Sequence, residues 1–254
     1  MGRGRPPFRG AQSRPNLLAN NRETKRGIRR MSQRSPSSIL AGLSVGIMLA
    51  TAGLVVAGEP KDSVSREDLV RAVEQGPGPD RGAPVAPVVM VAFSDFQCSY
   101  CRLFWREVFP QIEERYIRSG KVRLVHRHLA ILGEASVRAA QAASCAYAQG
   151  KFWEYHDALF RNTSPLAFTS ARLKGYAGEL GLEEKPFGAC LDGNKYAKRV
   201  EAETILGRAL GANGTPAFLL NGQLLIGAYP FPTFQQTLDG LLASQPQGPS
   251  RQSK

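Results

Sequence analysis

The sequence predicts a mixed α/β domain with the order strand–helix–strand, a helical block, and strand–strand–helix. The first half is indicated by a continuous apolar run over 85–93, a helical pattern over 99–118 and an alternating strand over 121–129. The stretch from about 133 to 211 is helical throughout. After it, Asn221-Gly222 separates two short apolar runs, as in a two-residue β-hairpin.

Charge is distributed unevenly along the 254 residues, whose net charge is +12. Residues 1–58 hold ten of the 33 basic side chains and one of the 21 acidic ones. The remainder is close to neutral, so no nucleic-acid-binding face is expected. An apolar content of 43% excludes a wholly disordered chain, and four cysteines are too few for a disulfide-dense scaffold.

The N-terminal 58 residues predict an export signal. Residues 1–34 form a basic tail without periodicity, which we expect to be disordered, and 35–58 contain no charged residue. The apolar core, 39–57, is long enough to span a bilayer, and Ala57 offers a cleavage site. A cleaved signal peptide and an uncleaved membrane anchor both remain open, and Arg29-Arg30 could also be a twin-arginine signal. In each case the rest of the chain is exported.

Local signals mark the remaining elements. A capping-box-like sequence at Ser65 starts a short helix within an expected linker, 59–84. The main domain is expected over 85–243, with Pro110 kinking its first helix. A last amphipathic helix covers 231–243, and 244–254 form a polar tail.

Cys98 and Cys101 form a CxxC pair at the junction of the first strand and its helix. Such a pair serves zinc sites, redox sites or a merely structural loop. Zinc needs further ligands at matching spacing, and the sequence offers none, so no metal is expected. At a helix N-terminus, free N–H groups and the helix dipole stabilise a thiolate. The position therefore favours a redox pair with Cys98 as the nucleophile.

The cysteine pair lies in the motif Phe93-Ser-Asp-Phe-Gln-Cys-Ser-Tyr-Cys101, and a second motif is Gly214-Thr-Pro-Ala-Phe218. Both motifs resemble those of the DsbA-like thioredoxin-fold family. The resemblance covers roughly 65–243 and includes the family's helical insertion, here about 133–211. It implies a thioredoxin fold in which Cys98 exchanges disulfides and Cys101 resolves the mixed disulfide. It also implies a cis-proline loop at Thr215-Pro216 that binds an extended substrate.

Two positions depart from the family pattern. The family usually carries a proline between its cysteines, whereas Ser99 and Tyr100 form the active-site dipeptide here. A buried acid often stands six residues before the nucleophile, and here that residue is Ala92. Asp95 is closer in sequence, but we expect it to contribute to the helix start.

The resemblance also bears on the other cysteines and on partners. Some family members carry a structural disulfide in the insertion, which predicts a bond between Cys145 and Cys190, the alternative being two buried thiols. No cofactor is expected. The implied partners are reduced exported proteins and a membrane redox protein of the DsbB or VKOR-like type, with membrane contact through 39–57 if that segment is uncleaved.

The histidines and the aromatic run after Lys151 are assigned structural roles. His126 and His128 are expected to be partly exposed at a strand end, and His156 to be packed. The aromatic residues of this run are expected in the core rather than in a substrate platform; they are Trp153, Tyr155 and Phe160.

The leading functional hypothesis is therefore an exported thiol–disulfide oxidoreductase that donates disulfides to extracytoplasmic proteins. A reductase or isomerase would use the same chemistry in another direction. A non-catalytic chaperone-type module on the same fold is a third hypothesis, and an intact dithiol argues against it.

Overall fold

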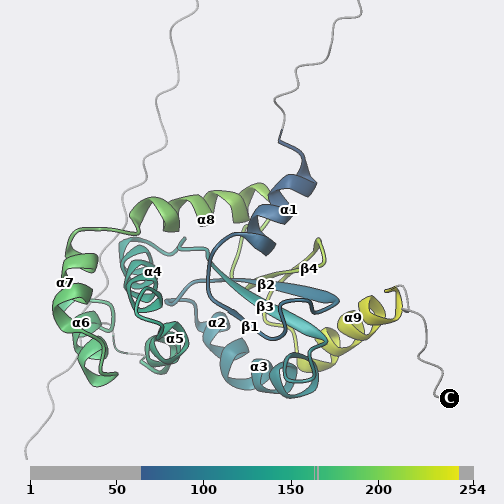
Figure 1. Ribbon diagram of the computed structural model, residues 1–254, viewed down its shortest axis with the longest axis horizontal. Helices are drawn as coiled ribbons and strands as arrows, with labels where there is room; N and C mark the ends of the chain where they lie inside the picture. The colour runs from purple at the N-terminus through teal and green to yellow at the C-terminus, as the bar shows by residue number, and fades with distance from the viewer. Residues whose placement is uncertain (1–63, 163, 165, 246–254) are drawn as a thin grey trace, which may run out of the picture. The chain divides into compact units, whose positions relative to one another are not determined.

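The computed structural model describes residues 64–162, 164 and 166–245 (Figure 1). The predicted basic tail 1–34, the apolar segment 35–58 with its signal or anchor, and nearly all of the tail 244–254 lie outside the described residues. Within the described ranges, no helix has the length and hydropathy required to cross a bilayer.

Helices and strands follow one another in the predicted order. In chain order they are α1 (Arg66–Gln75), β1 (Asp80–Arg81), β2 (Val88–Ser94), α2 (Ser99–Leu103), the π-helical turn η1 (Phe104–Val108), α3 (Phe109–Ile112), a second π-helical turn η2 (Glu113–Ile117), β3 (Val122–His128), α4 (Glu134–Tyr147), α5 (Phe152–Arg161), α6 (Ser170–Glu179), α7 (Glu184–Asp192), α8 (Ala197–Ala209), β4 (Ala217–Leu220), β5 (Gln223–Ile226) and α9 (Phe231–Ala243).

The strands form one sheet in the order β1-β3-β2-β4-β5. β2 is parallel to β3 and antiparallel to β4, with Phe93 opposite Ala217 and Met90 opposite Leu220. β4 and β5 form the predicted hairpin, and both turn residues, Asn221 and Gly222, have positive φ as a type I′ turn requires. The predicted thioredoxin-type α/β fold with a helical insertion is confirmed.

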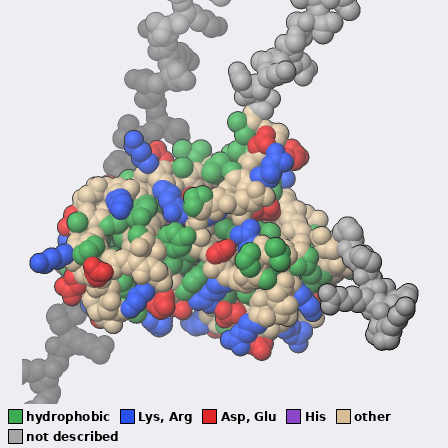
Figure 2. Space-filling view, in the orientation of Figure 1, with side chains coloured by type: hydrophobic (Ala, Val, Ile, Leu, Met, Phe, Trp, Pro, Cys, Tyr) green, Lys and Arg blue, Asp and Glu red, His purple; other side chains and the backbone are tan. Residues whose placement is uncertain are grey.

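Helices cover both faces of the sheet (Figure 1). α2, α3 and α9 lie on one face, and α1 and α8 lie on the other. The central strand β2 serves both layers, since Met90 faces the first core and Phe93 the second. This explains why its sequence is continuously apolar. On the face in Figure 2, basic and acidic side chains are interspersed over the described residues.

The helical segment after β2 adapts to its internal proline through π-helical turns. The N–H of Phe109 bonds to the carbonyl of Phe104, five residues back. Pro110 follows as the second residue of α3, where it cannot donate a backbone hydrogen bond to the preceding turn. The interruption predicted at Pro110 is thus accommodated by a wider turn on its N-terminal side.

The segment expected to be a linker contributes to the folded unit. The capping box of Ser65 and Asp68 is present at the start of α1. Nearly buried Arg127 of β3 donates to the carbonyl oxygens of Val73 (2.8 Å) and Gly76 (2.7 Å), which fixes the end of α1 against the sheet. The strand β1 was not predicted, because two residues carry no periodicity and only pairing with β3 defines them.

The helical insertion, α4 to α8, joins β3 to β4. Cys145 of α4 and Cys190 of α7 are joined by a disulfide. At the end of the insertion, α8 approaches the sheet at Gly207. A Cβ atom placed there would lie 3.0 Å from the ring of Phe93 and 3.2 Å from Leu129, both fully buried.

This close approach predicts that Gly207→Ala destabilises the protein by overpacking. Gly240→Ala in α9 is the matched control, because nothing lies within 4 Å of its added methyl group. The control should gain the ordinary helical advantage of alanine. Denaturant unfolding should separate the two variants by about 1–3 kcal/mol in favour of Gly240→Ala. Equal stabilities would contradict the tight packing of α8 on β2.

Candidate active site

Cys98 occupies the N-cap position of α2, directly after the loop that leaves β2. Its sulfur accepts a hydrogen bond from the backbone N–H of Cys101 at 3.4 Å. Cys98 is 7% exposed and Cys101 is fully buried. Cys98 therefore keeps a small exposed surface, whereas Cys101 has none.

The two halves of the fold meet at Cys98. Pairing of β2 with β4 brings Thr215, 117 residues away in sequence, beside the cysteine. The Cys98 sulfur lies 3.2 Å from the Thr215 carbonyl oxygen, to which it donates a hydrogen bond in its protonated form. The peptide bond between Thr215 and Pro216 is cis. Cys98, Thr215 and Pro216 thus lie at one site, and Cys101 lies directly behind it.

The two thiols differ in acidity. A hydrogen bond from the Cys101 thiol, with further ones from the Thr215 side chain and the backbone N–H groups of Cys101 and Tyr100, lowers the pKa of Cys98 to about 6. Burial, together with the neighbouring Cys98, raises the pKa of Cys101 well above its usual value. At neutral pH Cys98 is therefore a thiolate and Cys101 a thiol.

The dipeptide between the cysteines faces solvent. Ser99 is exposed, and the Tyr100 side chain is 64% exposed. A groove of about 490 Å³ runs along the same helical segment, between Leu103 and Val108 on one side and Tyr229 and Phe231 on the other. Leu103 and Tyr229 are exposed apolar residues, which makes this groove suited to an apolar partner.

Asp95 has a larger role than the one expected for it. It is 1% exposed, and its carboxylate accepts from the Gln97 N–H at 2.8 Å, as expected for a residue near the helix start. It also accepts from the N–H of Ile131 (2.9 Å) and the hydroxyl of Ser136 (2.7 Å) in the segment after β3. The loop that presents Cys98 is thereby tied to the insertion, and no local pattern signals these distant bonds.

The expectation that His126 and His128 are partly exposed is wrong. They are 0% and 2% exposed, because the insertion covers the end of β3 and packs Phe152 of α5 against both rings. Burial lowers the pKa of His128 to about 4 and holds the pKa of His126 well below its usual value, so both rings are neutral. His126 is opposite Ala92, the position where the family often has an acid. His156 is packed, as predicted.

No cluster of three or more metal-ligating side chains occurs in the part of the chain that the structure describes. The neighbouring histidine rings are instead surrounded by aromatic residues, Phe96 among them.

Comparisons with known proteins agree with this geometry. A family model described as thioredoxin matches residues 74–240. Disulfide bond formation protein D of Bacillus subtilis is 25% identical over 171 residues, covering 63% of this chain and 77% of that protein. The structure of a thioredoxin-like oxidoreductase from Silicibacter pomeroyi superposes with a TM-score of 0.61 at 29% identity, covering 69% of this chain and 98% of that one.

A second kind of relative shares only part of its length with this chain. The Na(+)/H(+) antiporter NhaA 1 of Salinispora arenicola is 35% identical over 165 residues, which cover 64% of this chain. The chain spans about a quarter (24%) of that antiporter's length. The transport named for that protein is accordingly not carried over to this one.

The acidity of Cys98 predicts its pH-dependent reactivity. Because the folded-state pKa is depressed to about 6, the thiolate is populated above that pH and lost below it. The rate of Cys98 alkylation by iodoacetamide should therefore rise with a midpoint near pH 6, against about 8.5 for an ordinary cysteine. In protein whose Cys98–Cys101 pair is reduced, peptide mapping should find the label on Cys98 and not on Cys101. A midpoint near 8.5, or preferential labelling of Cys101, would reverse the assignment.

Proposed function

Because the chain belongs to the DsbA-like family of thioredoxin-fold thiol–disulfide oxidoreductases, we propose that it forms disulfides in exported proteins through its Cys98–Cys101 pair. The observation that carries the proposal is the stabilised thiolate of Cys98 beside a buried, protonated Cys101. A stabilised thiolate favours the reduced, dithiol form of the enzyme. The enzyme disulfide therefore tends to oxidise the thiols of its client and to become reduced itself.

The exchange proceeds in two steps. A client thiolate attacks the Cys98 sulfur of the enzyme disulfide, forming a bond between client and Cys98 while Cys101 leaves and takes up a proton. A second client thiolate then attacks the client sulfur of this mixed disulfide, and Cys98 leaves as a thiolate. The client loses two electrons and gains a disulfide, and the enzyme is reduced to the dithiol. No cofactor is needed, since the sulfur atoms carry both electrons.

Each cysteine suits its role for a physical reason. Cys98 is a good leaving group because the hydrogen bonds that lower its pKa also stabilise the departing thiolate. Cys101 is fully buried, so a client cannot reach its sulfur and attack falls on Cys98. In the reverse direction, Cys101 lies one helical turn from Cys98 and can release a trapped mixed disulfide.

The loop at Thr215-Pro216 and the groove beside Leu103 and Tyr229 form the client-binding surface of the proposal. The backbone of Thr215 is already within hydrogen-bond distance of Cys98, so a client segment must pass there to reach the sulfur. Extended segments bind such exposed backbone through main-chain hydrogen bonds. The apolar groove, where Leu103 and Tyr229 are exposed, adds side-chain contacts without a strict sequence requirement.

Location and reoxidation complete the proposal. The basic tail and the apolar segment 39–57 support export, with or without retention as a membrane anchor. A disulfide between Cys145 and Cys190 also fits an oxidising compartment. Each turnover leaves the enzyme reduced, so a membrane oxidant of the DsbB or VKOR-like type is the expected partner that restores the Cys98–Cys101 disulfide.

Removal of the resolving thiol tests the proposed exchange. Cys101→Ser protein is loaded at Cys98 with 5-thio-2-nitrobenzoate and mixed with a peptide that contains one cysteine. We expect release of the coloured thiolate, and a peptide adduct on Cys98 that dithiothreitol reverses. Cys98→Ser is the matched control and should neither load nor form an adduct, because its remaining thiol is buried. Failure of the loaded Cys101→Ser protein to accept the peptide would contradict exchange at Cys98.

A further inference from the structure

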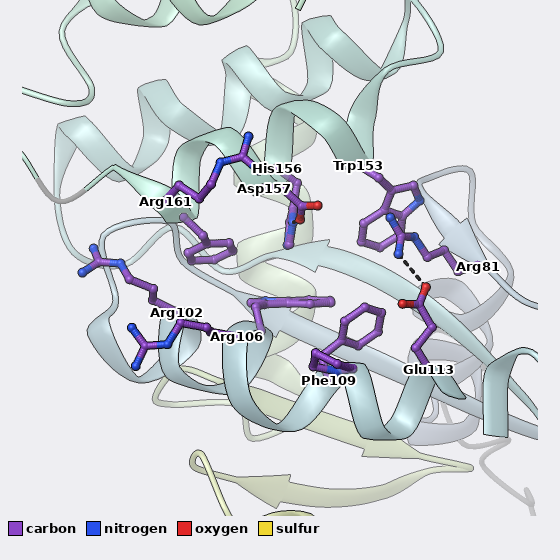
Figure 3. Close-up of a pocket in the computed structure, with 12 residues that line it drawn as sticks. Arg81, Arg102, Arg106, Phe109, Glu113, Trp153, His156, Asp157 and Arg161 are labelled. Atoms are coloured by element: carbon purple, nitrogen blue, oxygen red, sulfur yellow. Dashed lines mark hydrogen bonds and ion pairs between the residues drawn. The ribbon is translucent and has the colours of Figure 1, made fainter. Parts of the chain in front are cut away.

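A second pocket lies on the opposite side of the helical segment that follows Cys101. It has a volume of about 430 Å³ and lies between that segment and α5 of the insertion (Figure 3). Pockets of this size hold small organic molecules. It shares no lining residue with the groove at Leu103 and Tyr229, so it is separate from the proposed client surface.

The walls of the pocket are aromatic. Trp105 lies 4.6 Å from Phe109 and 6.4 Å from Phe160 between ring centroids, and Trp153 closes another side. Trp153 was expected in the core, but it is only half-buried and borders the pocket. Rings arranged around an open space favour a planar, apolar occupant.

The charge of the pocket is positive and concentrated at one end. Four arginines and two acids line it. Figure 3 shows Arg102, Arg106 and Arg161 at one end, and Arg81 paired with Glu113 at the other, 2.7 Å apart. Among the described residues, the side chains of Arg102 and Arg161 make neither a hydrogen bond nor an ion pair, and the Nε atom of Arg102 is buried without a partner. Two guanidinium groups therefore remain available to an anion.

A buried histidine supplies an independent indication of a ligand. His156 is 1% exposed and lines the pocket, and its Nδ1 is 2.8 Å from the Asp157 carboxylate. Its Nε2 is buried without a hydrogen-bond partner. Burial lowers the pKa of His156, so the ring is neutral and Nδ1 holds the proton shared with Asp157. Nε2 is then an unused acceptor, which a hydroxyl or N–H group of a ligand would satisfy.

We propose that this pocket binds a planar aromatic anion, such as an aryl carboxylate, sulfonate or phosphate. The rings of Trp105, Phe109 and Phe160 contact its apolar body, and Arg102 and Arg161 bind its acidic group. Binding of this ligand does not depend on the proposed disulfide exchange, since the pocket contains neither cysteine of the pair.

Two dyes that share a ring system test the proposal. The anionic probe is 8-anilinonaphthalene-1-sulfonate, and N-phenyl-1-naphthylamine lacks its sulfonate. Binding is read from quenching of tryptophan emission, because the two tryptophans of the chain, Trp105 and Trp153, both line the pocket. The full chain should bind the sulfonate about a hundredfold more tightly than the neutral dye, about tenfold for each of the two charge-assisted hydrogen bonds.

Arginine variants locate the anion. Arg102→Gln and Arg161→Gln should each weaken binding of the sulfonate by about tenfold and leave binding of the neutral dye unchanged, which also shows that the pocket is intact. Arg208→Gln, an exposed arginine of α8 outside the pocket, is the matched control and should bind both dyes like the unmodified protein. Equal affinities for the two dyes, or pocket variants that behave like Arg208→Gln, would overturn the proposal.

Discussion

The antiparallel pairing of β2 with β4 brings together two segments that are more than 100 residues apart in sequence, and the site depends on it. Phe93 opposite Ala217 fixes the ends of both strands, so that Thr215 meets Cys98 with a sulfur-to-oxygen distance of 3.2 Å. Helices pack on both faces of β2 and bury its side chains in two cores, and this burial fixes the register. A slip by one residue would turn Phe93 toward the wrong core and separate the cysteine from its loop.

Within that frame, burial and hydrogen bonding give two neighbouring thiols opposite properties. Cys98 receives hydrogen bonds from Cys101 and from backbone N–H groups at the start of α2, which favour its thiolate. Cys101, one turn further along, is enclosed by the core, which favours its neutral thiol. Asp95 holds the loop between β2 and α2 in place from the insertion side. The insertion therefore contributes to the site although it carries neither reactive cysteine.

Local sequence patterns predicted much of this arrangement. Three predicted features depend only on neighbours in sequence: the helix-terminal position of Cys98, the capping box at Ser65 and the Asn221-Gly222 turn. Features that depend on distant contacts were missed or misjudged. The strand β1 exists only through pairing with β3, and His126 and His128 are buried because α5 packs over them. The pocket between α5 and the helical segment after Cys101 likewise results from tertiary packing.

The reduction potential of the Cys98–Cys101 pair tests the central claim, that a stabilised Cys98 thiolate makes this protein an oxidant. It is obtained from the fraction of disulfide at equilibrium with glutathione buffers. A pKa of about 6 lies between about 7 for thioredoxin and about 3.5 for DsbA. The account predicts a potential between their values of about −270 and −120 mV, at about −230 mV if the potential scales with the pKa. A value at or below about −270 mV would identify a reductant and contradict the claim.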